Sequence, residues 1–174
     1  FVEPGTPDTH TFRIDRFLPD PQGGNNTADW SYHDGHFYAN KAPGPILLGT
    51  AFYAVLYALE RGLGVDPHTH HTEILNLYLI NLFVSGLIGT IGILAFRRAL
   101  LALAVPAPKA TWLAAALALG TMLFPYNTQL WGHTTAAAFM CMSLWALIAA
   151  GPRGLFGCGF FVGMAVLTDY LAGI

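Results

Sequence analysis

Charged residues are scarce in this sequence. Only 10% of its 174 residues are Asp, Glu, Lys or Arg, whereas 54% are hydrophobic. A soluble domain usually has about a quarter charged residues, so much of the surface must face something other than water. The sequence has no basic face of the kind that binds nucleic acid. Its two cysteines, Cys141 and Cys158, lie in apolar runs without zinc or haem spacing, and we interpret them as small hydrophobic residues.

The few charges are distributed unevenly along the chain. Nine of the ten acidic residues and six of the seven histidines precede residue 74. We therefore divide the chain into an outer-face segment, 1–73, and a transmembrane bundle, 74–174. Because Phe1 already lies in polar sequence, we expect this chain to be a piece of a longer protein with another span upstream.

Four apolar runs follow the polar segment. A helix needs about 20 apolar residues to cross the hydrocarbon core, and the runs predict spans at residues 75–96, 110–124, 130–150 and 155–171. Small residues that permit close helix approach recur in them, including Gly86, Gly89, Gly92, Ala136, Ala138, Gly157, Gly159 and Gly163. The predicted fold is an all-α integral membrane protein with a four-helix transmembrane bundle.

There is a fifth apolar run, 45–60, and the positions of the cations indicate whether it crosses the membrane. If this run crossed the membrane, Arg97, Arg98, Lys109 and Arg153 would all lie outside. If it does not cross, all four lie inside, as the positive-inside rule requires. We therefore predict an interfacial amphipathic helix on the outer face for this run.

The outer segment contains candidate binding residues. Its many prolines and glycines exclude long helices from residues 1–44. Acids, histidines and aromatics are mixed at 29–38, where Asp29, His36 and Tyr38 are candidates for binding a sugar; an interfacial aromatic belt is the alternative. Lys41 is a candidate for holding a phosphate or, alternatively, a lysine that snorkels at a helix end.

Several of these stretches, taken in order, resemble one family. Residues 35–44, which include Lys41, resemble the lysine motif of GT-C-fold glycosyltransferases, such as bacterial aminoarabinose and protein O-mannosyl transferases. Residues 2–5 and 11–15 resemble the segment after the first span in bacterial members. Residues 124–133 resemble the second outer loop, and 166–170 the end of a later span.

The resemblance implies a function at the outer face of the bacterial inner membrane. Such enzymes transfer a sugar from a polyprenyl-phosphate donor, with an outer-loop carboxylate as the base. That base is expected upstream of Phe1, so the catalytic residue of this chain stays unknown. The chain has His133 where the family often has an aspartate. The resemblance implies no certain cofactor and leaves a divalent metal open.

His133 and Asp169 are the remaining candidates for substrate binding. Both lie near the outer ends of their predicted spans, where an ionisable group indicates function. We expect their side chains to share one outer cavity with Lys41 or with the aromatics near Trp30. The alternatives are an interfacial hydrogen bond for His133 and a helix cap for Asp169.

Other readings stay open. His68 and His70 have the spacing of a metal-chelating pair, although an ordinary polar turn fits them as well. Asn76 and Asn81 are expected to bond to neighbouring helices. The chain as a whole could also be a catalytically silent accessory or scaffold subunit of a larger membrane complex, with the lipid bilayer and other subunits as its partners. A transporter is a weaker interpretation, because no predicted span has a central charge or a broken-helix pair in matching halves.

Overall fold

The computed structural model describes residues 30–149 and 151–173, and most of them are helical. The chain forms two compact units, 1–41 and 42–174. The described part of the first unit contains two antiparallel strands, β1 (Trp30–His33) and β2 (His36–Ala39). The run 45–60, expected in the outer segment, thus belongs to the second unit, with the apolar helices.

The two strands form a hairpin that the sequence analysis does not predict. Its turn residues Asp34 and Gly35 have φ of 49° and 82°, and Asp-Gly in this left-handed region is a preferred two-residue hairpin turn. Trp30 and Phe37 pack edge to face with ring centroids 4.7 Å apart. The all-α class is therefore wrong for this unit and right for the described part of the second.

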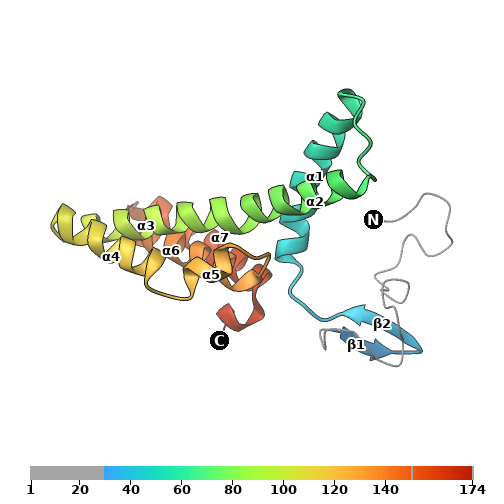
Figure 1. The fold of residues 1–174 in the computed structure, drawn as a ribbon. Coiled ribbons are helices and arrows are strands. Elements are labelled where there is room, and N and C mark those ends of the chain that lie inside the picture. The colour runs from blue at the N-terminus through green and yellow to red at the C-terminus, as the bar shows by residue number, and fades with distance from the viewer. Residues whose placement is uncertain (1–29, 150, 174) are drawn as a thin grey trace. The chain divides into compact units, whose positions relative to one another are not determined.

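The second unit consists of helices joined by short connections (Figure 1). In chain order they are α1 (Gly44–Gly62), α2 (His70–Asn81), the π-helix η2 (Leu82–Leu87), α3 (Ile88–Ala102), α4 (Ala107–Leu119), α5 (Leu123–Asn127), α6 (Gly132–Ala149), α7 (Gly151–Thr168) and the 3₁₀ helix η3 (Tyr170–Gly173). Elements α2, η2 and α3 are continuous and form the long helix His70–Ala102 of 33 residues.

Two helices in the described part of the chain are long and apolar enough to cross a membrane: His70–Ala102 and α6. The first extends beyond the predicted span 75–96 at both ends, and α6 lies within the predicted 130–150. The predicted span 110–124 is broken, because α4 ends at Leu119 after 13 residues and a turn leads into α5. At the predicted span 155–171 the structure has the apolar helix α7, which begins earlier, at Gly151, and ends at Thr168; it is not one of the two helices long and apolar enough to cross.

Close helix packing depends on some of the expected small residues. A Cβ added at Gly92 would lie 2.5 Å from the Cα of Ala138, so α3 and α6 meet almost backbone to backbone. At Gly157 an added Cβ would lie 3.3 Å from the Cβ of Ala146, which brings α7 against α6. Gly159 and Gly163 have no neighbouring atom within 4 Å of an added Cβ, so their expected packing role is wrong.

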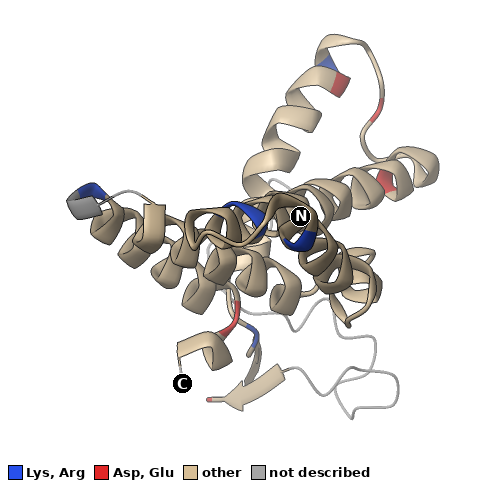
Figure 2. Cartoon of the chain, turned by 90° about the vertical axis from the view of Figure 1, so that its left-hand side faces the viewer, with Lys and Arg blue, Asp and Glu red and all other residues tan. Residues whose placement is uncertain are grey.

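Cations gather at one end of the helices in the second unit. Arg97 Nε donates to Thr111 Oγ1 at 3.0 Å, which joins the last turns of α3 to the first turns of α4. The Arg98 guanidinium lies 5.5 Å from the ring centroid of Trp145, near the end of α6. Lys109 and Arg153 lie in the first turns of α4 and α7. Figure 2 views this unit from the side on which α3 ends and α4 begins.

The first half of α1 packs against the long helix His70–Ala102. Phe52 stacks on Phe83 of η2, with ring centroids 4.2 Å apart, and a Cβ added at Gly49 would lie 3.1 Å from Ile80. Further along, burial and the nearby carboxylates of Glu60 and Glu73 raise the pKa of Tyr53. The helix α1 is not among those long and apolar enough to cross a membrane.

Candidate functional site

Three chain segments meet at the end of the helices opposite the cations. A Cβ added at Gly44, the first residue of α1, would lie 2.5 Å from Thr168 Cγ2 and 2.6 Å from the Leu167 carbonyl oxygen. A Cβ added at Gly132, the first residue of α6, would overlap the carbonyl oxygen of Thr168 and lie 3.5 Å from Pro45 Cγ. Only glycine fits at both positions. This backbone contact fixes the residues that follow Gly132 and Thr168 relative to one another.

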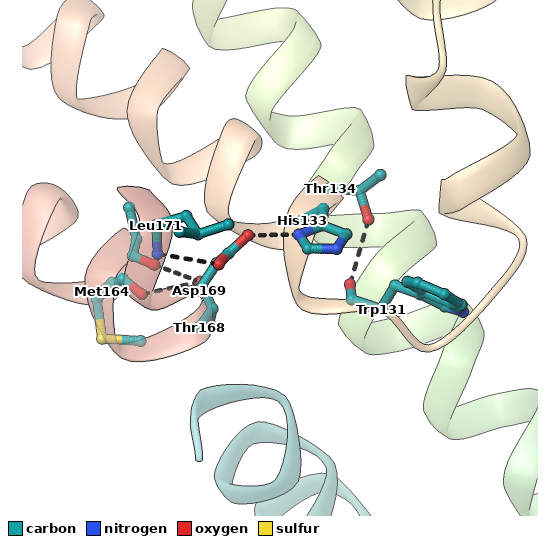
Figure 3. Close-up of polar contacts among 8 residues, drawn as sticks. Trp131, His133, Thr134, Met164, Thr168, Asp169 and Leu171 are labelled. Atoms are coloured by element: carbon teal, nitrogen blue, oxygen red, sulfur yellow. Dashed lines mark hydrogen bonds and ion pairs between the residues drawn. The ribbon is translucent and has the colours of Figure 1, made fainter. Parts of the chain in front are cut away.

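Those two residues are His133 and Asp169, and their side chains are joined. His133 Nδ1 is hydrogen bonded to Asp169 Oδ2, and Figure 3 shows the second ring nitrogen pointing away from the carboxylate. The other carboxylate oxygen, Oδ1, accepts the backbone N–H of Leu171 at 3.1 Å. The side chain of Asp169 is 18% exposed and that of His133 is 47% exposed. The carboxylate is thus held from two directions, while the imidazole stays accessible.

Aromatic rings surround the imidazole. Its centroid lies 6.0 Å from that of Tyr126 and 5.8 Å from that of Trp131, and these two rings stack on one another at 5.6 Å. His133 and Tyr126 also line an open, mainly apolar cavity of about 350 Å³. The remaining cavity wall consists of Thr121, Met122, Leu123, Thr134 and Ala137.

The segment between α5 and α6 is bonded to the long helix His70–Ala102, in and around the π-helix η2. Asn81 Nδ2 donates to the Thr128 carbonyl oxygen at 2.8 Å, and Ser85 Oγ donates to that of Gln129 at 2.8 Å. A Cβ added at Gly89 would overlap the side chain of Asn127. A π-helical turn inside a longer helix is frequently found at functional sites. Here it lies beside the loop that leads directly to His133.

The hydrogen-bonded pair His133 and Asp169, called the dyad below, fixes which ring nitrogen carries the proton when the imidazole is neutral. A carboxylate can only accept a hydrogen bond, so the proton of a neutral His133 lies on Nδ1 and Nε2 keeps its lone pair. No described residue is hydrogen bonded to Nε2. A histidine oriented in this way by a carboxylate can take a proton from a hydroxyl group or accept its hydrogen bond.

The candidates in the first unit occupy the hairpin and the chain just after it. In the register of β1 and β2, His36 faces His33 and Tyr38 faces Ser31. Opposite residues of an antiparallel pair share a face, so His36 and Tyr38 lie together on the polar face. Lys41 follows β2 and is exposed. Asp29 lies outside the described residues.

The sequence-based expectations for this site have mixed outcomes. The expected proximity of His133 and Asp169 is confirmed by their hydrogen bond. The alternative for Asp169 was a cap on a neighbouring helix or a bond to Tyr170, whereas Oδ1 accepts from Leu171 N, in the η3 turn that follows Asp169 itself. That Lys41 or the aromatics near Trp30 share a cavity with these two residues stays a prediction. The sequence analysis missed Tyr126 as a neighbour of His133 and Gly132 as the residue that permits the contact.

Two further expectations concern polar residues around α2. Asn81 bonds to the loop residue Thr128 and not to a neighbouring helix, while the side chain of Asn76 is buried without a hydrogen-bond partner in the described chain. The histidine-rich segment forms a capped turn: Asp66 Oδ1 accepts the N–H of His68 at 3.0 Å, and Thr69 is the N-cap of α2. Within residues 30–149 and 151–173, no three metal-ligating side chains gather.

Comparisons of the chain with protein-family models, with curated proteins and with solved structures found no match.

Proposed function

We propose that this chain belongs to a multi-pass membrane glycosyltransferase that takes a sugar from a polyprenyl-phosphate donor on the outer face of the bacterial inner membrane. One observation carries the proposal. His133 and Asp169 come from two separate stretches that resemble GT-C-fold enzymes, 124–133 and 166–170, and their side chains are hydrogen bonded. Two motifs far apart in sequence thus contribute to one polar site.

The membrane topology proposed with this function has four crossings. The first crossing lies within the long helix His70–Ala102, whose 33 residues exceed the roughly 20 that the hydrocarbon core requires. The other crossings are α4 with α5, then α6, then α7. The end that carries Arg97, Arg98 and Lys109 is the cytoplasmic end, so His133 and Asp169 lie at the outer end.

In this topology α1 lies along the outer membrane surface. Its apolar residues Ile46, Leu47, Val55 and Leu59 are each more than half exposed in the chain alone, and a lipid surface would cover them. Glu60 and Arg61 at the end of the helix would remain in the polar layer. This arrangement requires no further protein subunit.

The cavity beside the dyad suits the junction of a lipid and a sugar phosphate. Met122, Leu123 and Ala137 offer an apolar wall for an isoprenoid chain, whereas Thr134, Tyr126 and His133 bring polar groups to the same cavity. For the first unit taken by itself, the family resemblance implies that Lys41 holds a phosphate as a point charge, and Asp29, His36 and Tyr38 are the candidates for binding a sugar.

A transfer assay tests the proposal. Membranes from cells that produce the protein are incubated with a radiolabelled polyprenyl-phosphate sugar, and label in lipid or protein acceptors is compared with that in membranes lacking the protein. We expect transfer that depends on the protein and that is lost in Lys41→Ala at unchanged expression. Transfer that does not depend on the protein would favour a catalytically silent accessory subunit.

A further inference from the structure

We infer that His133 is the proton acceptor of the transfer reaction, acting through Nε2, and that Asp169 is its positioning residue. This inference rests on the proposed function, because it names the group that deprotonates the hydroxyl acceptor. It assigns the base to a side chain of this chain, whereas the family resemblance implies a carboxylate upstream of Phe1. The position of Asp169, the accessibility of His133 and the balance of the reaction step each support it.

The geometry favours Asp169 as the positioning residue and not as the base. Its Oδ2 accepts from His133 Nδ1 and its Oδ1 accepts from Leu171 N at 3.1 Å. The backbone is fixed as well, since Asp169 N donates to Ala165 O at 2.9 Å and its carbonyl oxygen accepts from Ala172 N at 3.0 Å. A carboxylate held at both oxygens and at its backbone orients its partner, and it has little freedom to approach a substrate.

The imidazole has the access that the carboxylate lacks. Its side chain is 47% exposed, compared with 18% for Asp169, and it forms part of the cavity wall next to Tyr126 and Thr134. Within the described part of the second unit, Asp169 and Tyr126 are the titratable side chains in contact with His133. A hydroxyl group in the cavity can therefore reach the imidazole of His133.

The reaction step balances as follows. Nε2 removes the proton of the acceptor hydroxyl while that oxygen forms a bond to the anomeric carbon of the sugar. The bond between the anomeric carbon and the phosphate oxygen breaks, and polyprenyl phosphate leaves with the electron pair. The imidazolium that results is stabilised by the Asp169 carboxylate and later releases its proton to water. The step needs no oxidant or reductant.

The test compares variants of the protein in proteoliposomes with a radiolabelled polyprenyl-phosphate sugar. We expect His133→Gln to lower kcat by about 10²- to 10⁴-fold with little change in KM, and Asp169→Asn to lower it by about 10- to 100-fold. Imidazole in the buffer should restore part of the activity of His133→Gly. The matched control His71→Gln replaces an exposed histidine of α2 and should retain full activity.

A second readout does not depend on turnover. The ¹⁵N spectrum of the neutral form of His133 should show a protonated Nδ1 and an unprotonated Nε2, and Asp169→Asn should change this distribution. If the wild type transfers sugar and His133→Gln does so equally well, this inference is overturned and the proposed function stands. If the wild type transfers nothing, both fail. A neutral His133 protonated on Nε2 would overturn the inference even in an active enzyme.

Discussion

His133 and Asp169 are 36 residues apart in sequence, yet Nδ1 of the histidine is hydrogen bonded to Oδ2 of the aspartate. The contact follows from the backbone, because Gly132 packs against the Thr168 carbonyl oxygen with no room for a side chain. A glycine before the histidine and a helix end before the aspartate thus create a polar pair among otherwise apolar helices.

Gly132→Ala should separate this pair. The new methyl group would overlap the Thr168 carbonyl oxygen, so α6 and α7 must move apart at this end. We expect an unfolding free energy lowered by about 1–3 kcal/mol, measured by denaturant titration in detergent, and loss of the Nδ1-protonated signal of His133. Gly159→Ala in α7 is the matched control, because its methyl group would meet no atom within 4 Å. Equal behaviour of the two variants would contradict the packing argument.

Gly92→Ala tests the packing of α3 against α6. The added Cβ would lie 2.5 Å from the Cα of Ala138 and 2.6 Å from its Cβ, and backbone atoms cannot rotate away. The variant should lose about 1–3 kcal/mol of stability, although alanine is intrinsically the better helix former by about 1 kcal/mol. Thermal unfolding in detergent would measure the difference. A variant more stable than the wild type would show that the two helices do not approach this closely.

Asn81→Ala should release the loop that leads to His133. The substitution leaves the Thr128 carbonyl oxygen without its donor, at a cost of about 1–3 kcal/mol if water cannot replace it. We expect faster amide hydrogen exchange in residues 128–131 and little change in α6. Thr90→Ala provides the control, because Thr90 Oγ1 bonds only to the carbonyl oxygen of Gly86 one turn earlier in the helical stretch. Unchanged exchange in the loop would mean that other contacts hold it.

Cysteine labelling tests the proposed topology. In a variant without Cys141 and Cys158, a cysteine at position 66 should react with an impermeant reagent added from outside. Cysteines at positions 98 and 153 should react only after the membrane is opened, because cations favour the cytoplasmic side. Labelling of position 98 from outside would mean that α1 crosses the membrane.

Helix existence could be predicted from the sequence, whereas helix length often could not. Long apolar runs predicted α6 and the apolar core of His70–Ala102. A run of about 20 apolar residues predicts a helix without any knowledge of its tertiary contacts. The break after Leu119 was missed, since Gly120 and Thr121 look like ordinary small residues in an apolar run. The π-helix contacts the loop through Ser85, which donates to the Gln129 carbonyl oxygen, and no local pattern encodes such a contact.

The candidate site was predictable in part. An ionisable residue near a helix end indicates function, and this reasoning found His133 and Asp169. It could not find Gly132, because one glycine among many gives no sign of which backbone it touches. The β-hairpin, in contrast, had a local signal in Asp34-Gly35 flanked by aromatics, which is a recognised hairpin pattern.

The most direct test of the central claim maps where a polyprenyl-phosphate lipid binds. A photoreactive polyprenyl-phosphate analogue is added to the protein in nanodiscs, irradiated, and located by mass spectrometry of the peptides. The account predicts cross-links to cavity residues such as Met122, Leu123 and Ala137, suppressed by unlabelled polyprenyl phosphate. Cross-links confined to the exposed residues Trp112 and Phe156, without competition, would show that the cavity beside His133 and Asp169 does not bind the donor.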